Sequence, residues 1–133
     1  MRDSIDFKDW LEKAGHNLRA AEALSALYCD RLADGILFHC HQVAEKSFKA
    51  FLLAKTKSMK RTTELNGLLR HCVKVESDFM KFQAFAFTLN RYYIAAQYPP
   101  AEPLSFPQEE AQTALNQARE IFAFTRTKLI TTN

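Results

Sequence analysis

The placement of proline and glycine constrains this chain more than any other feature of its sequence. All four prolines lie between Pro99 and Pro107, and only three glycines occur in 133 residues. Tight turns depend on these two residue types, so little room is left for the many turns of an all-β sandwich. The chain before Pro99 is therefore expected to form long helices.

Apolar residues recur at steps of three and four in four long segments, the spacing of one face of an amphipathic helix. We expect long helices over 7–28, 34–57 and 79–96 and from 107 to about 129, and a short third helix that ends near Val75. Stripes of this kind pack as nearly antiparallel helices joined by short connections.

Residues that satisfy free backbone groups mark the expected helix ends. The expected caps are Ser4 or Asp6 for the first helix, Thr62 or Thr63 for the third, and Ser77 or Asp78 for the fourth. Their short side chains can accept a hydrogen bond from an unpaired backbone N–H group. The pair Pro99-Pro100 ends the fourth helix, because proline lacks an N–H and disfavours helical conformation in the residue before it.

The composition is that of an ordinary folded protein. Hydrophobic residues make up 47% of the chain and charged residues 25%, which argues against disorder. Neither repeats nor a second domain is evident. The sequence therefore predicts one all-α domain over 1–133, an up-down four-helix bundle with an additional short helix and thus five helices.

No membrane span or secretory leader is expected, since no segment approaches the roughly 20 apolar residues of a span. Cys29, Cys40 and Cys72 are an odd number without CxxC spacing. They are predicted to be free thiols in a reducing, cytoplasmic setting. A metal site is not expected, because the consecutive residues His39, Cys40 and His41 point about 100° apart on a helix.

The second helix carries a polar strip opposite its apolar stripe. The polar strip consists of His39, Gln42, Glu45, Lys46 and Lys49. Ammonium, amide and imidazole groups together can hold a phosphate and hydrogen-bond the edge of a base. The alternative is an ordinary i,i+4 ion pair between Glu45 and Lys49 on a solvated face. Under both interpretations the polar strip is expected to stay accessible to solvent.

A second candidate group lies at the end of the fourth helix. Arg91, Tyr92, Gln97 and Tyr98 place a cation, two aromatic rings and an amide close together. Tyrosine can stack on a base while its hydroxyl bonds a phosphate or a ribose. Tyr93 continues the apolar stripe and is expected to pack in the core.

Positive charge is concentrated between Lys46 and Lys74. This segment holds eight basic residues and one acid, Glu64, although the whole chain carries a net charge of only +3. A basic patch attracts phosphates through counterion release, so a nucleotide such as ATP, or RNA, is a candidate ligand. The alternative is that the lysines of this segment are simply solvated.

Three motifs follow one another along the chain. They are FHCHQVAEKSFKAFL over 38–52, RTTEL over 61–65 and YYIAAQYPP over 92–100. The first follows the pattern F-x-x-x-Q-x-x-E-K-x-x-K-A-x-L, and the ordered set resembles the HEPN family (higher eukaryotes and prokaryotes nucleotide-binding domains). In that family the second motif usually has His and Asp where Thr63 and Glu64 stand, and the third has Arg and Asp where Gln97 and Pro100 stand.

The resemblance implies a helical domain that is often a homodimer and is sometimes paired with a nucleotidyltransferase-like partner. Some branches are ribonucleases or toxins with an Arg-x(4–6)-His motif, a spacing that this sequence lacks. We therefore expect a non-catalytic nucleotide-binding or protein-interaction module, like one half of a toxin–antitoxin pair. The alternative is an RNA-cleaving toxin with a divergent site at His39 or His71. Phe85 and Phe87, which lie off the apolar stripe, also favour a homodimer.

Overall fold

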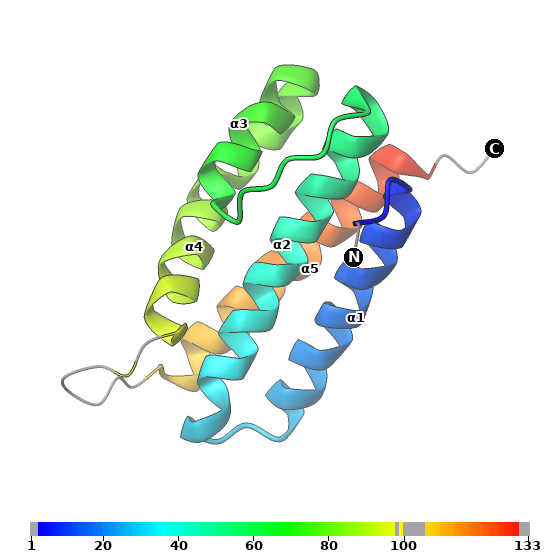
Figure 1. The fold of residues 1–133 in the computed structure, drawn as a ribbon. Helices are drawn as coiled ribbons and strands as arrows, with labels where there is room; N and C mark the ends of the chain where they lie inside the picture. The colour runs from blue at the N-terminus through cyan, green and yellow to red at the C-terminus, as the bar shows by residue number, and fades with distance from the viewer. Residues whose placement is uncertain (1–2, 98, 100–105, 131–133) are drawn as a thin grey trace.

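The computed structural model describes residues 3–97, 99 and 106–130, without the side chains of 30, 96 and 97. These residues form an all-α bundle (Figure 1). Its elements are α1 (Phe7–Ala26), η1 (Asp30–Leu32), α2 (Ala33–Thr56), α3 (Leu65–Val75), η2 (Ser77–Phe82), α4 (Gln83–Gln97) and α5 (Gln108–Leu129). The predicted bundle of long helices with one additional short helix is confirmed, with five α-helices in the described residues.

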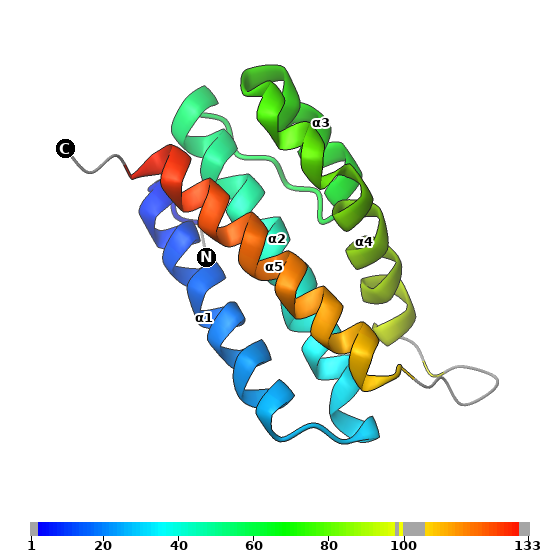
Figure 2. The same cartoon turned by 180° about the vertical axis from the view of Figure 1, so that it is seen from behind.

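Helix α2 lies at the centre of the bundle, and the other four α-helices all pack on it. In Figure 1, α1 runs along one side of α2 and α3 and α4 along the other, and Figure 2 shows α5 across the back. Fifteen of the 24 residues of α2 are buried. Polar side chains on this helix must therefore find partners within the protein.

Phenylalanine rings fill the core between α2, η2 and α5. The ring of Phe79 lies 6.0 Å from that of Phe48, 4.5 Å from that of Phe51 and 5.0 Å from that of Phe124, measured between centroids. Edge-to-face and tilted contacts of this kind add to the stabilisation from burial. The apolar stripes read from the sequence thus meet as expected.

Phe85, one of the two phenylalanines that favoured a homodimer, packs within its own chain. Phe85 is half-buried and packs against the core, with its ring 6.0 Å from that of Phe82. Phe87 is 56% exposed. Of this pair, Phe87 alone therefore remains largely open to a partner.

The expected fourth helix begins differently from the prediction. Residues Ser77–Phe82 form a 3-10 helix, and the α-helix starts only at Gln83. Both helix types bring residues three apart onto one side, so the spacing of Phe79 and Phe82 does not distinguish them. The predicted end is confirmed, since the helix stops at Gln97 before the prolines.

Helix α3 is capped by a residue other than the predicted threonines. The carboxylate of Glu64 accepts hydrogen bonds from the backbone N–H groups of Asn66 at 2.8 Å and Gly67 at 2.7 Å. The Thr62 hydroxyl instead accepts from the Glu64 N–H at 3.0 Å. For α1, by contrast, Asp6 is the cap, as one of the two predicted residues.

Replacing Glu64 by alanine is expected to lower the free energy of unfolding by about 1 kcal/mol, because two N–H groups lose their acceptor. Urea denaturation followed by circular dichroism measures this change. Thr63→Ala is the matched control and should change stability by less than about 0.5 kcal/mol, as an exposed substitution. Equal losses for the two variants would show that the carboxylate is not the cap.

No helix in the described part of the chain is long and apolar enough to cross a membrane. Cys40 and Cys72 are buried free thiols, as expected, whereas Cys29 is exposed. Burial raises the pKa of the Cys40 thiol to about 12, so this side chain stays protonated and behaves as a small apolar residue.

Candidate functional site

Helix α1 packs along the polar strip of α2, which is therefore less exposed than the sequence predicted. Glu45 is 5% exposed and Lys49 7%, while His39, Gln42 and Lys46 are half-buried. The helical wheel separated polar from apolar residues correctly. It was wrong about solvent because α2 is surrounded by neighbours, so its polar side also meets another helix.

Hydrogen bonds join the polar strip to α1. The Lys46 ammonium donates to Asn17 Oδ1 at 2.8 Å and to Gln42 Oε1 at 3.0 Å. Asn17 Nδ2 lies 3.0 Å from His39 Nδ1. Asn17 is itself a buried polar residue of α1, so its amide bridges His39 and Lys46 across the contact between the two helices.

Glu45 and Lys49 form the ion pair that the i,i+4 spacing predicted, but in a buried place. Lys49 Nζ lies 3.0 Å from Glu45 Oε2, and the two side chains are only 8% and 7% exposed. Gln42 Nε2 donates to the other carboxylate oxygen at 3.4 Å. The Lys49 ammonium also lies 5.7 Å from the centroid of the Trp10 ring, a distance at which a cation is attracted to the ring face.

His41, next to the polar strip, is fully buried and neutral. Its Nε2 lies 3.1 Å from the Thr63 carbonyl oxygen, and its Nδ1 lies 3.3 Å from Gln42 Nε2. These contacts fit one tautomer, in which Nε2–H donates and Nδ1 accepts. Desolvation lowers the pKa of His41 to about 4. Its ring stacks on that of Tyr93, with centroids 3.8 Å apart. Tyr93 is half-buried at this contact, and the core residue expected from the sequence at this end of α4 is instead Tyr92, which packs against the core.

A cavity of about 330 Å³ opens beside the polar strip, near the start of α1. It is lined by Ser4, Asp9, Trp10, Lys13 and Lys46. Only Lys46 among these was a candidate from the sequence. Trp10, Lys13 and Asn17 are three and four residues apart on α1 and so share one face of this helix. This spacing was the sequence signal that could have identified them as neighbours of the polar strip.

The charges around this cavity favour an anion. Burial lowers the pKa of Lys46, and the nearby cations Lys13 and Lys49 lower it further, against the opposing effect of Glu45. Two lysines, Lys13 and Lys46, line the cavity with one carboxylate, that of Asp9, which accepts a hydrogen bond from the Ser4 hydroxyl at 2.6 Å. An added negative group would relieve the repulsion among the lysines.

The second candidate group is separate from the polar strip. Arg91 and Tyr92 line a cavity of about 360 Å³ together with Phe106 and Glu110 at the start of α5. The ring of Tyr92 lies 5.6 Å from that of Phe106. Burial, and then the Glu110 carboxylate that shares a hydrogen bond with it, raise the pKa of Tyr92. The Gln97 side chain and Tyr98 lie outside the described residues.

Comparison with known proteins agrees with this architecture. A sequence model of the HEPN domain matches residues 7–128, nearly the whole chain. The chain belongs to the HEPN family. The crystal structure of TT1696 from Thermus thermophilus is similar to this HEPN domain at 32% sequence identity and a TM-score of 0.76, covering 92% of this chain and 98% of that one. None of the curated proteins matches the sequence.

Three histidines of this HEPN domain differ in their surroundings. His39 and His41 are hydrogen-bonded within the bundle. His71 is partly exposed, and its pKa is lowered by slight burial and by Lys60, Lys74 and Arg70. Within 3–97 and 106–130, no three His, Cys, Asp or Glu residues are grouped as metal ligands would be.

Of the two departures of this HEPN domain from its family pattern in the connection before α3, the one at Glu64 acts through its side chain, whereas Thr63 contributes only a backbone group. Glu64, at the usual Asp position, caps α3. Thr63, at the usual His position, supplies the carbonyl oxygen that His41 approaches. Both positions therefore serve the connection between α2 and α3. Pro100, at the usual Asp position of the third motif, lies outside the described residues.

Proposed function

We propose that this HEPN domain is a non-catalytic module that binds a nucleotide through its phosphates at the cavity between α1 and α2. The observation that carries the proposal is the meeting of Lys13 and Lys46 beside the Trp10 ring. Ammonium groups bind phosphate, and an indole ring is a stacking surface for a base.

In this proposal, one lysine of the polar strip binds the ligand and another stabilises the fold. Lys49 is held by Glu45 at 3.0 Å, so we assign it to the internal network. Lys46 has two acceptors, Asn17 and Gln42, among the described residues. An ammonium carries three N–H donors, so Lys46 keeps one for a phosphate oxygen, and Lys13 supplies the second cation.

The same proposal includes a protein partner, either a second copy of the chain or a nucleotidyltransferase-like protein. The family supports this, and so does Phe87, which is 56% exposed. The free buried thiols are compatible with a cytoplasmic location. The internal bonding of His39 and His41 argues against either histidine as the acid or base of an RNA-cleaving site.

Isothermal titration of the full chain with ATP is expected to give saturable binding, which Lys46→Met and Lys13→Met each weaken about tenfold through the loss of one charge-assisted contact. Trp10→Leu should weaken ATP more than it weakens inorganic triphosphate, since only ATP has a base to stack. Because salt screens the attraction between the lysines and the phosphates, binding should be weaker at higher salt.

Lys8→Met provides a matched control, because Lys8 is an exposed lysine of α1 that lines a different cavity. It should leave the affinity for ATP within about twofold of the unmodified chain. Circular dichroism and thermal unfolding of each variant separate lost binding from lost folding. Heat of binding that is absent for every common nucleotide would reject the nucleotide part of the proposal.

A further inference from the structure

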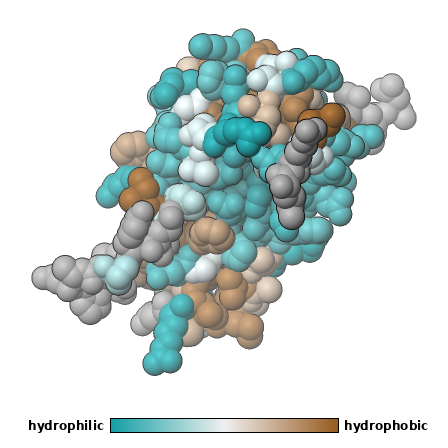
Figure 3. Space-filling model, viewed as in Figure 1, coloured by the Kyte–Doolittle hydropathy of each residue, from teal (hydrophilic) through white to brown (hydrophobic). Residues whose placement is uncertain are grey.

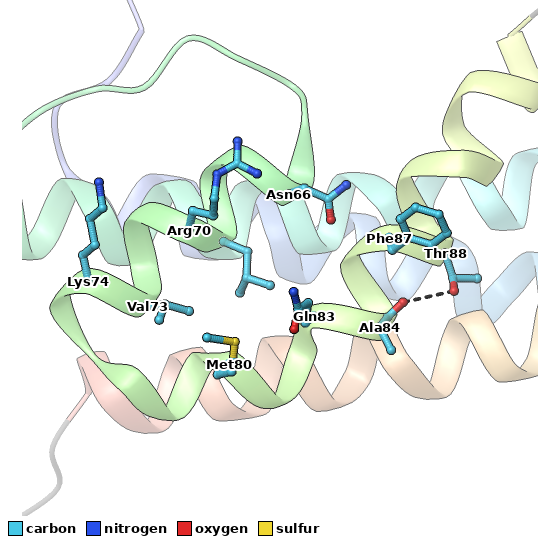
Figure 4. A pocket seen from close by; sticks show the side chains of 10 residues that line it. Asn66, Arg70, Val73, Lys74, Met80, Gln83, Ala84, Phe87 and Thr88 are labelled. Carbon is cyan, nitrogen blue, oxygen red and sulfur yellow. Dashed lines mark hydrogen bonds between the residues drawn. The ribbon is translucent and has the colours of Figure 1, made fainter.

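A long groove runs between α3 and the η2–α4 segment (Figure 4). Its volume is about 960 Å³, well above that of the two cavities described above. Figure 4 shows Val73 and Met80 pointing into it from its two sides, with Ala84 and Phe87 farther along α4. Leu69 completes an apolar floor.

Much of this apolar surface is open to solvent. Met80 is 52% exposed, Phe87 56% and Ile94 56%. Met80 and Phe87 both line the groove, and Ile94 lies seven residues beyond Phe87, on the same side of α4. The left edge of the space-filling view, where α4 runs, is one of the places where hydrophobic side chains reach the surface (Figures 1 and 3). Exposed apolar surface of this kind marks a contact surface.

Cations border the groove. Arg70 and Lys74 lie one helical turn apart on α3 and line it, and Figure 4 shows them along its α3 edge. Arg91 lies on the α4 side, 6.0 Å from the centroid of the Phe87 ring. The lining residues include no carboxylate.

The acids at the two ends of the groove are already engaged. Glu64, before α3, caps that helix through two backbone N–H groups. Glu76 and Asp78, between α3 and η2, lie 3.5 Å and 3.6 Å from the Lys128 ammonium. Among the described residues, none of these carboxylates forms an ion pair with Arg70 or Lys74.

These features decide between three occupants. Two copies of the chain related by a twofold axis would set this basic rim against itself, which is unfavourable. A nucleic acid would match the rim but would leave most of the aliphatic floor without a partner, since stacking needs rings and Phe87 is the ring that lines the groove. A protein segment with apolar and acidic side chains satisfies both the floor and the rim.

We propose that the groove between α3 and α4 binds an acidic amphipathic helix of a protein partner. Apolar residues spaced i, i+4 and i+7 on that helix would lie on the floor, and Asp or Glu residues beside them would face Arg70, Lys74 and Arg91. The 11 residues of α3 give the groove a length of about 16 Å, which suits about three turns of a helix. This inference deepens the partner half of the proposed function and is independent of nucleotide binding.

Fluorescence anisotropy with the full chain tests the proposal. The probe is a labelled helical peptide of about four turns, with leucines at i, i+4, i+7 and i+11 and glutamates on both flanks. Saturable binding is expected, and a peptide with lysines in place of the glutamates should bind at least tenfold more weakly. Phe87→Asp and the double variant Arg70→Glu/Lys74→Glu should each weaken the acidic peptide at least tenfold.

Two exposed residues away from the groove give matched controls. Leu27→Asp places a carboxylate at an apolar side chain that is 73% exposed, and Lys8→Glu reverses a charge on α1. Both should leave peptide affinity within about twofold. ATP binding of the Phe87→Asp and Arg70→Glu/Lys74→Glu variants should also stay unchanged, so failure of this inference and failure of the nucleotide proposal are distinguishable.

Several outcomes would overturn the inference. These are the absence of saturable peptide binding, binding that the groove variants leave unchanged, and equal affinity for the lysine peptide. A homodimer by light scattering that Phe87→Asp converts to the 15.3 kDa monomer would identify a second copy as the occupant. Displacement of the acidic peptide by a single-stranded RNA oligonucleotide at lower concentration than by unlabelled peptide would identify nucleic acid.

Discussion

Replacing Glu45 by glutamine is expected to lower the free energy of unfolding by about 3 kcal/mol, because the Lys49 ammonium then stays buried without a counter-charge. Both side chains of this pair are less than a tenth exposed, so water cannot solvate the remaining charge. Lys49→Met is expected to cost about as much, since it leaves the Glu45 carboxylate buried. Urea denaturation of the two variants measures both losses.

The double variant Glu45→Gln/Lys49→Met distinguishes the loss of the ion pair from the effect of leaving one buried charge without a partner. It leaves no unpaired charge, so its loss is expected to be about 1 kcal/mol, smaller than that of either single variant. The control is a surface pair, Arg119 and Glu22, whose atoms are 2.8 Å apart but whose side chains are 43% and 40% exposed. Glu22→Gln should lower stability by less than about 1 kcal/mol. If Glu45→Gln costs no more than Glu22→Gln, the buried pair does not stabilise the fold.

The free energy of unfolding is expected to fall by about 3 kcal/mol between about pH 7 and pH 4 through His41 alone. The pKa of this histidine is lowered from 6.5 to about 4 in the folded chain, and one pKa unit corresponds to about 1.4 kcal/mol. Above pH 6.5 the ring is neutral in both states, so its full contribution is present. As the pH falls toward 4, the unfolded chain takes up a proton that the folded chain excludes, and stability is lost.

Several groups around His41 act on its pKa, and burial has the largest effect. Hydrogen bonds to the Thr63 carbonyl and the Asn90 side chain raise the pKa, and Lys46 and Lys49 lower it, but desolvation is the largest effect. Glu45 Oε1 lies 3.8 Å from His41 Nδ1. Because the ring is neutral at about pH 7, this approach is not an ion pair in the stable fold.

Two variants isolate the contribution of His41. His41→Gln removes the titrating ring, so the stability difference between about pH 7 and pH 4 should shrink by about 3 kcal/mol relative to the unmodified chain. Ser47→Ala, at a buried residue of α2 that carries no titrating group, should leave the pH dependence unchanged. Urea denaturation over a series of pH values gives both curves. An unchanged slope in His41→Gln would mean that folding does not lower the pKa of this ring.

The helices were predictable because their signals are local. Steps of three and four place Phe7, Leu11 and Ala14 on one face, and the prolines from Pro99 onward end the fourth helix whatever its neighbours are. The 3-10 start at Ser77–Phe82 was not predictable in this way. Its two buried phenylalanines have a spacing that suits both helix types.

The surroundings of the polar strip were not predictable, because a helical wheel assigns faces but not neighbours. The wheel placed Glu45 and Lys49 together correctly. Whether water or another helix lies beside them depends on how α1 packs, which cannot be predicted from the sequence of α2 alone. A polar residue inside the stripe of α1, Asn17, was the available hint, since a buried amide needs a hydrogen-bonding partner.

The central position of α2 has a consequence for how the protein is made. Helix α5, the last of the five to be synthesised, packs on both α2 and α1, so the nascent chain keeps the apolar back of α2 uncovered until α5 has emerged. Domains whose hydrophobic surface stays exposed during synthesis are prone to aggregate or to bind chaperones. For this protein, the interval before α5 emerges is the period in which chaperone protection matters most.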